Sequence, residues 1–430
     1  MKKFLFVFLL LLSLNLLASP FDKENWQGQG ELSFEFRQFK NDDIPSTVDG
    51  GQAVFGRVET RWEEDAYKTV FRGLFRTDRL DSSRDVMFIE DAYFSMNFMQ
   101  EWRLYAGYKI FNWTATEAFH PADVVNSRNW DSNLEYLDKR GELTLELNRS
   151  VWNGDISFYY WPRYERPLYP SASNRLGFGQ TLRPPVFVDD HSNDRRGQQW
   201  GVRLDQHVGT ADISLHVLQH MDRNFAVVGE SNYTLVPIFI SPSGVIPNST
   251  PTIPYFFRDT QVGGTLQYVL GGLIIKAEGA IRKFKKDLNI LTARGFRTPV
   301  DHQEIAAGFE YGIVHDNGTE STFFLEGDTI LGTSEAQRAE LSAFQRDVFL
   351  GYRFAFNDQD SREIFVAGIT DLERANENFY SAKYSQRIGD SWKVGTGLRF
   401  YEAPQKGTYA TGLEVLNGDN QFFLTLTRYL

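Results

Sequence analysis

The 430-residue chain contains no cysteine, which excludes a disulfide scaffold, a lipidated N-terminal cysteine and thiolate metal sites. Long apolar runs are also absent after the first twenty residues, because charged residues interrupt them and the mean hydropathy is −0.38. A membrane protein built from spanning helices is therefore excluded. The net charge of −11 makes the chain a poor polyanion ligand, so we expect no nucleic-acid partner.

The one long apolar run lies at the start, in MKKFLFVFLLLLSLNLLASP. Lys2 and Lys3 precede the run from Phe4 to Leu17, and the small residues Ala18 and Ser19 follow it. A membrane anchor is the alternative, but a spanning helix needs about 20 apolar residues. The pattern predicts a secretory signal peptide over residues 1–18 and an exported domain over residues 19–430.

Most of the exported chain alternates apolar and polar residues with a period of two. In EWRLYAGYKIFNW, residues 101–113, Trp102, Leu104 and Tyr108 share one parity, and Arg103 and Lys109 share the other. Such alternation predicts β-strands with one apolar and one polar face. Helical spacing is suggested only over residues 333–344, where we expect a short helix inside a loop.

Short and long breaks between these strands alternate. Pairs such as Gly209-Thr210, Gly271-Gly272 and Gly389-Asp390 predict tight hairpin turns, whereas residues 112–136, 164–196, 224–257, 285–301 and 403–420 form long connections. Aromatic residues make up 15% of the chain, which suits interfacial girdles.

The sequence therefore predicts an all-β, transmembrane antiparallel up-and-down barrel of a bacterial outer membrane. We expect about 18 strands, the first beginning near Gly30 and the last covering residues 421–430; 16 strands is the alternative count. A soluble β-sandwich or propeller is the alternative fold.

Two stretches resemble known outer-membrane proteins. The C-terminal FFLTLTRYL resembles the assembly signal of bacterial outer-membrane barrels, although it ends on Leu430 where those signals usually end on an aromatic residue. GYKIFNW followed by HPADVVNSRN, residues 107–129, resembles the DUF1302-type porin-like family, with Thr114-Ala115 where that family commonly has Gly-Glu. The second resemblance implies a large monomeric or trimeric channel of unassigned substrate.

Strand parity places charged side chains in the barrel interior. We expect a cationic wall and, across the barrel, an anionic wall, which together make a transverse field in the aqueous gap. The predicted pore-lining residues are Lys68, Arg72, Arg76, Arg103, Lys109, Glu304, Glu310, Glu326 and Asp328. A packed salt-bridge network that fills the barrel is the alternative reading of the same charges.

The connection over residues 112–136 is the first candidate for a constricting loop, with a solvated cap as the alternative. Its chemistry-bearing residues are Glu117, His120, Asp123 and Arg128. Asp212, Ser214 and His216 share one inward face and carry the groups of a catalytic triad, but alternate strand residues lie about 6.6 Å apart, too far for a hydrogen-bonded triad.

The favoured function is a porin-like channel through which small or hydrophobic solutes diffuse along a charged, aromatic-lined lumen. The alternative is a non-conducting barrel that acts as an adhesin or assembly protein through its outer loops. We expect no enzymatic activity, no cofactor and no metal. The expected partners are outer-membrane lipid and lipopolysaccharide, the barrel-assembly machinery, a small-molecule solute and, in a trimeric form, two further copies of the chain.

Overall fold

The computed structural model describes residues 25–40, 47–130, 138–177, 184–188, 196–224, 227–229, 253–286, 288–292, 295–374, 377–403 and 413–430. The predicted signal peptide lies outside these residues. Among the described residues, no helix is both long and apolar enough to cross a bilayer.

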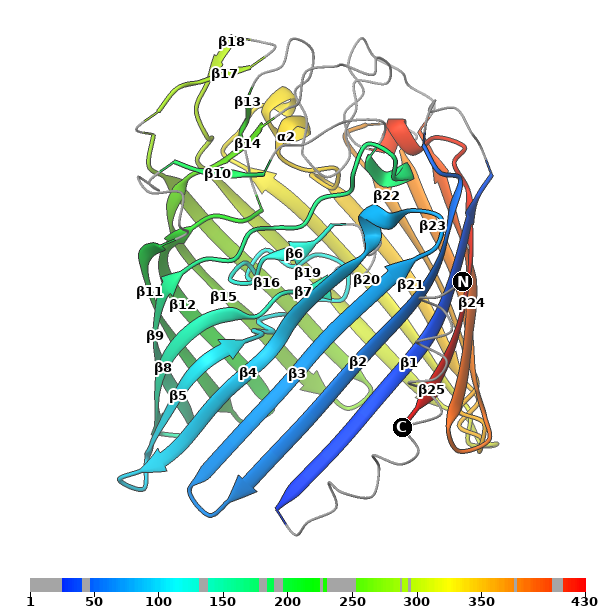
Figure 1. Ribbon diagram of the computed structural model, residues 1–430, viewed down its shortest axis with the longest axis horizontal. Coiled ribbons are helices and arrows are strands. Elements are labelled where there is room, and N and C mark those ends of the chain that lie inside the picture. Colours follow the sequence, from blue (N-terminus) through cyan, green and yellow to red (C-terminus); the bar gives the residue numbers. More distant parts are fainter. Residues whose placement is uncertain are drawn as a thin grey trace.

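Eighteen antiparallel strands form one closed sheet, as predicted, so the 16-strand count and the sandwich and propeller alternatives are wrong (Figure 1). In order around the ring the strands are β1 (Trp26–Phe39), β2 (Gly50–Glu64), β3 (Tyr67–Asp78), β4 (Val86–Phe98), β5 (Trp102–Lys109), β8 (Glu142–Val151), β9 (Gly154–Arg163), β11 (Arg196–Val208), β12 (Ala211–Met221), β15 (Arg258–Leu270), β16 (Leu273–Phe284), β19 (His302–Val314), β20 (Glu320–Leu331), β21 (Asp347–Ala355), β22 (Glu363–Asp371), β23 (Asn378–Ile388), β24 (Trp392–Glu402) and β25 (Gln421–Tyr429).

The last strand closes the ring on the first. β25 pairs antiparallel with β1 from Glu31 opposite Tyr429 to Phe39 opposite Gln421. The backbone of Leu430 then donates to the carbonyl of Gly30 at 2.9 Å. Closure leaves the barrel without a free sheet edge, which is the condition for strands to cross a bilayer. β1 starts at Trp26, earlier than expected, because Trp26 pairs with Trp62 near the end of the long strand β2.

The eight connections at one end of the barrel are short turns. Gly209, Gly271 and Gly389 adopt positive φ values of 66°, 60° and 61° there, a region that glycine enters at little cost. This end carries the predicted hairpins and is called the turn side below.

The other end, the loop side, carries the long connections and the remaining short elements. These are β6 (Arg128–Asn129), β7 (Asp138–Lys139), β10 (Val186–Phe187), β13 (Val227–Gly229), β14 (Ile253–Phe256), β17 (Ile290–Thr292), β18 (Gly295–Arg297), the 3-10 turns η1 (Ser82–Arg84), η2 (Arg175–Gly177) and η3 (Leu413–Leu416), and the helix α2 (Glu335–Leu341). The helix lies within the segment where one was expected, and Ser334 and Gln337 form a capping box at its start.

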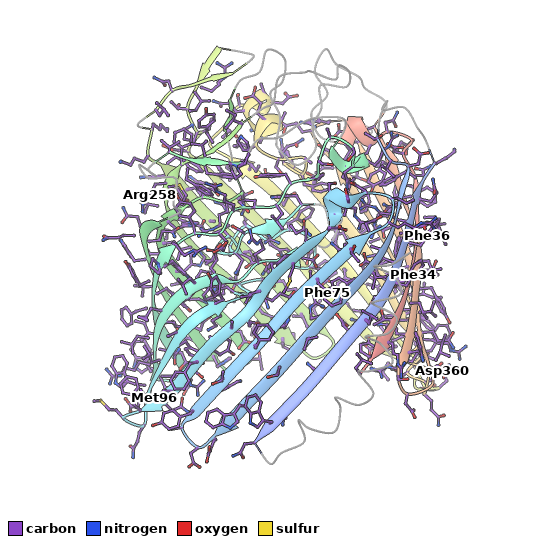
Figure 2. The ribbon with its side chains drawn as sticks, in the orientation of Figure 1. Phe34, Phe36, Phe75, Met96, Arg258 and Asp360 are labelled. Atoms are coloured by element: carbon purple, nitrogen blue, oxygen red, sulfur yellow. The ribbon has the colours of Figure 1, made fainter. Side chains whose placement is uncertain are left out.

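The outer surface is apolar and the buried side chains face inward. Outward residues such as Phe34, Val262 and Ile305 are 40%, 48% and 45% exposed (Figure 2 labels Phe34). Tyr67 and Trp392, at the turn-side ends of their strands, also face outward and fit an interfacial aromatic belt. The barrel thus turns its apolar face toward lipid and its polar face toward the interior.

Candidate pore site

Arginines on neighbouring strands converge on one buried carboxylate on the inner face of β2, β3 and β4. Arg57 donates to Glu90 at 2.7 Å and to Glu31 at 2.6 Å, and Arg72 donates to the same Glu90 oxygen at 2.7 Å. Glu90 is 2% exposed. Because two arginines share it, much of the positive charge expected on this wall is neutralised locally.

A β-bulge places Glu90 in this position. The register of β3 and β4 shifts between Arg72 and Gly73, so that Glu90 has no directly opposite partner while Asp91 pairs with Arg72. A bulge inserts one extra residue and reverses the alternation beyond it. The Asp91 carboxylate accepts the backbone N–H of Ile110 at 2.9 Å and so holds the chain where it leaves β5.

The other predicted cations divide between buried ion pairs and less buried positions nearer the turn side. Arg76 is buried and contacts Glu35 at 3.0 Å and Asp138 at 3.4 Å. Lys109 pairs with Glu146 and lies over the ring of Tyr105. Lys68 and Arg103 lie nearer the turn side, where Arg103 is exposed and donates to the side chains of Asn97 and Tyr105.

The predicted acids of the opposite wall also have partners. β3 is the third strand and β19 the twelfth around the ring of 18, so the two face each other. Glu310 pairs with Lys276 at 2.7 Å, and Glu304 pairs with Arg282. Asp328 accepts the backbone N–H of Asp347 at 3.0 Å. Strand alternation places these charges in the interior but does not identify their counter-charges, which are Glu35, Glu90, Glu146, Lys276 and Arg282.

The segment that follows β5 crosses the interior and reaches the far wall. Glu278 of β16 accepts the backbone N–H groups of Ala115 and Thr116 at 2.5 and 2.9 Å and the Thr116 hydroxyl at 2.7 Å. The same carboxylate accepts the N–H of Ala122 at 3.4 Å. β5 and β16 are the fifth and eleventh strands of the ring, so these bonds span the barrel.

Glu326 of β20 anchors the same segment. Its two oxygens accept the N–H groups of Glu117 and Ala118 at 2.6 and 2.9 Å. The neighbouring Phe119 enters a buried cluster with Phe324 and Phe349 of the far wall. Residues 115–122 are thus held by two carboxylates and an aromatic contact, none of which is near them in sequence.

The return half of the segment is fixed by charge. Asp123 contacts Lys139 at 2.5 Å and Arg128 at 3.1 Å, and His120 Nδ1 lies 3.6 Å from Glu278. Burial acts to raise the pKa of the Asp123 carboxyl, but Lys139 and Arg128 outweigh burial and hold that pKa below its usual value. The ion pairs therefore persist at neutral pH.

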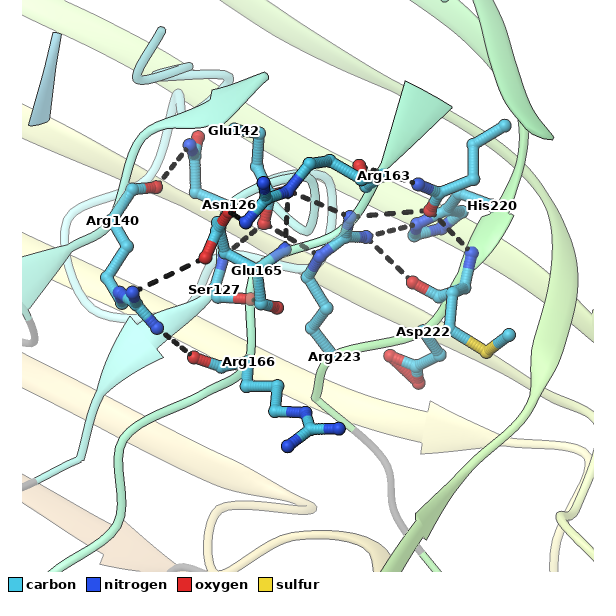
Figure 3. Close-up of polar contacts among 12 residues, drawn as sticks. Asn126, Ser127, Arg140, Glu142, Arg163, Glu165, Arg166, His220, Asp222 and Arg223 are labelled. Carbon is cyan, nitrogen blue, oxygen red and sulfur yellow. Dashed lines mark hydrogen bonds and ion pairs between the residues drawn. The ribbon is translucent and has the colours of Figure 1, made fainter. Parts of the chain in front are cut away.

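A second buried network joins this segment to the wall beneath the loops (Figure 3). Glu142 and Arg223, both fully buried, are paired at 2.9 Å, and Glu142 also accepts the N–H groups of Ser127 and Glu165 at 3.2 and 3.0 Å. Arg140 donates to the carbonyl of Arg166. The network ties three loop-side connections to one carboxylate.

Aromatic side chains pack between the crossing segment and the wall of β9 and β12. Trp113 lies 5.5 Å from Tyr159, and Tyr159 stacks on Trp161 at 5.4 Å. The guanidinium of Arg203 lies 4.8 Å from the ring of Trp113. All three aromatic residues are at most 6% exposed, so they support the segment rather than line open space.

The structure gives Asp212, Ser214 and His216 separate partners, so the three do not form a catalytic triad. Ser214 bonds to Thr265 at 2.7 Å, His216 bonds to Gln261 at 3.0 Å, and Asp212 pairs with His207. Within the described part of the chain, no group of three or more His, Cys, Asp or Glu residues could hold a metal ion.

Comparison with known proteins gives similarity in structure alone. In sequence, no family model and no curated protein matches the chain. OccK3 (OpdO) of Pseudomonas aeruginosa is 13% identical with a TM-score of 0.52, and the match covers 95% of this chain and 96% of that one. OpdK of the same organism, solved with vanillate, is 10% identical with a TM-score of 0.51 over 95% and 99%. OccD3 (OpdP) is 8% identical with a TM-score of 0.51 over 95% and 91%.

The chain has the fold of outer-membrane porins. Together with the apolar outer face, the porin fold indicates a bacterial outer membrane as its location, as the sequence predicted. The resemblance of residues 107–129 to the DUF1302-type family remains a resemblance of that stretch, because no family model matches.

Proposed function

We propose that the protein is a porin-like channel that lets small solutes diffuse across the outer membrane, and that residues 112–130 narrow its lumen. The observation that carries this proposal is the crossing segment, bound at Glu278 and Glu326 on the far side of a closed 18-strand barrel. Barrels of 16 to 18 strands enclose an aqueous bore that folded-in segments restrict.

The anchoring contacts support a fixed constriction rather than a solvated cap. Backbone N–H groups bound to buried carboxylates are charge-assisted hydrogen bonds, which are about twice as strong as neutral ones. Glu278 and Glu326 are 3% and 2% exposed. A segment held in this way keeps Glu117, His120, Asp123 and Arg128 at set positions, and we propose that it defines the narrowest passage.

Selectivity in this proposal comes from the charges that face the bore. Lys68 and Arg103 project inward on β3 and β5, on the turn side of the crossing segment. Rings and clusters of such charges set ion preference in pores. Arg72, Arg76, Lys109, Glu304 and Glu310 act in neutralised pairs, and we propose that they shape the wall rather than attract solute.

Planar bilayer recording tests the channel. Purified, heat-modifiable protein is expected to give discrete conductance steps, and Lys68→Glu/Arg103→Glu is expected to shift the reversal potential in a salt gradient toward cation preference. Arg149 and Arg428, which face outward over the rings of Trp102 and Trp392, supply the matched control, since Arg149→Glu/Arg428→Glu changes the net charge by the same amount outside the bore.

Two results would contradict the proposal. A bilayer that holds folded protein and stays silent would indicate the non-conducting, adhesin-like barrel. A reversal potential that moves equally in the Arg149→Glu/Arg428→Glu control would show that the inward charges do not set ion preference.

A further inference from the structure

The outward face of the β15–β16 hairpin changes from apolar to basic along its length. Cross-strand rows from the turn side upward are Leu270/Leu273, Tyr268/Ile275, Leu266/Ala277, Gly264/Gly279, Val262/Ile281 and Thr260/Lys283. The backbone N–H of Lys285 donates to the carbonyl of Arg258 at 2.8 Å, which adds a last row, Arg258/Lys285, of the same parity.

The basic rows lie where the apolar band should end. From Leu270 to Val262 the strand advances eight residues, about 26 Å at about 3.3 Å per residue. At a tilt of about 45° this corresponds to a height of about 19 Å, and the Lys283 row lies about 5 Å higher. Since the apolar band of such barrels is about 25 Å tall, Lys283 and Lys285 fall at the headgroup level on the loop side.

These cations form a basic patch on an acidic protein. Lys283 and Lys285 are exposed, and the adjacent Lys286 contacts Asp301 at 3.0 Å. Arg258, labelled at the loop-side edge of the barrel in Figure 2, donates to the carbonyl of Gln198 at 2.8 Å. Three outward cations thus gather on one hairpin of a chain whose net charge is −11.

Outward cations at the turn side have different surroundings. Arg149 lies 5.2 Å from the ring of Trp102, and Arg428 lies 5.7 Å from the ring of Trp392. These two residues come from well-separated strands, β8 and β25, and each belongs to the aromatic belt. At the loop side, by contrast, the three cations come from adjacent strands about 4.8 Å apart and from consecutive rows about 6.6 Å apart.

We propose that Arg258, Lys283 and Lys285 form a binding site for the phosphate groups of a glycolipid in the leaflet on the loop side. Clustered ammonium and guanidinium groups at the membrane surface recognise phosphorylated head groups, and Arg binds phosphate oxygens in a bidentate manner. The apolar rows below the site, Val262/Ile281 downward, provide the surface against which the acyl chains of the same lipid lie. The site is on the outer wall, so it does not depend on conduction through the lumen.

Native mass spectrometry in detergent micelles tests the site with diphosphorylated lipid A as the probe. A basic residue at a membrane surface contributes about a fivefold factor in binding, so Lys283→Gln/Lys285→Gln is expected to weaken lipid A retention about 25-fold. Arg258 is left in place because it also bonds to the β11 backbone. The matched control is Arg149→Gln/Arg428→Gln, which removes two outward cations at the opposite edge and is expected to retain lipid A as the unaltered protein does.

Three results would overturn this site. The lysine variant could retain lipid A as well as the unaltered protein does, or the control variant could lose as much lipid A as the lysine variant. The unaltered protein could also retain the same glycolipid without its phosphates as well as it retains lipid A. Displacement of lipid A by inorganic phosphate at a similar concentration would likewise show a free-anion site rather than a lipid site. Heat-modifiable gel mobility confirms that each variant is folded, and bilayer conductance, unchanged in all of them, separates this test from that of the channel.

Discussion

Removal of the Glu278 carboxylate should release the crossing segment from the far wall. Its side chain is fully buried and accepts the Ala115 and Thr116 N–H groups and the Thr116 hydroxyl at 2.5 to 2.9 Å. A hydrogen bond to a charged group contributes about 1.5–3 kcal/mol. Because the bonds share one acceptor and water can replace part of them, the contributions are not additive.

We therefore expect Glu278→Ala to weaken the anchor by about 3 kcal/mol, which raises the ratio of released to bound segment about 150-fold. Glu326 still holds Glu117 and Ala118, so the single variant loosens the segment and Glu278→Ala/Glu326→Ala frees it. Single-channel recording should show larger, noisier conductance steps in that order.

Limited trypsin digestion from the loop side reports the same event independently. Arg128 lies inside the segment and is held by Asp123, so cleavage after Arg128 should be slow in the unaltered protein and faster in the variants. Glu310→Ala is the matched control, since Glu310 is an inward carboxylate that pairs with Lys276 rather than with the segment. Unaltered conductance and trypsin protection in Glu278→Ala, or equal changes in Glu310→Ala, would refute the anchoring role.

Three further outcomes follow from buried or capping contacts. Arg223→Met leaves the Glu142 carboxylate unpaired in a fully buried site and should destabilise the barrel by about 3–5 kcal/mol, seen as a lower unfolding temperature on gels, whereas no shift would contradict the role of that pair. Because the pKa of Asp123 is lowered in the folded protein, its carboxylate stabilises the segment above about pH 4, and this stabilisation is lost as the pH falls through the folded-state pKa. Protection of the segment from an acid-active protease should therefore decrease over that pH range. Asp123→Asn should show no such decrease. Ser334→Ala removes the cap of α2 and should destabilise that helix by about 1 kcal/mol, detectable by hydrogen exchange, while a fall in conductance would be unexpected.

The strands were predictable because each barrel strand has a different solvent on each face. Residues that face lipid are apolar and residues that face the interior are polar, so apolar and polar residues alternate along strands such as β15 and β16. The count of 18 followed from the need for an even number with both termini on one side. The early start of β1 was missed, since Gly28 and Gly30 alternate with glutamines there and give no hydrophobic signal.

The crossing segment could be nominated from its length and polar residues, but its anchors could not. Glu278 and Glu326 lie more than 150 residues away from the groups they bind. These carboxylates come close to the segment only when the ring is closed and the segment turns inward. No local sequence pattern predicts that contact. Strand alternation predicts the face of the sheet on which each carboxylate lies, but it does not predict which group the carboxylate binds.

The ion pairs of the cationic wall were missed for a more specific reason. With uniform alternation, Ile89 and Asp91 share one face and Glu90 the other, so that an acid would fall on each side of β4. Ile89 and Phe94 both face outward, although they are five residues apart and strict alternation would place them on opposite faces. The bulge accounts for the extra residue, because Glu90 and Asp91 both point inward there. Glu90 then meets Arg57 and Arg72, while Asp91 holds the start of the crossing segment. The change of phase between Ile89 and Phe94 is the signal in the sequence that predicts this bulge. The local neutralisation of this wall and the place where the crossing segment leaves β5 both follow from it.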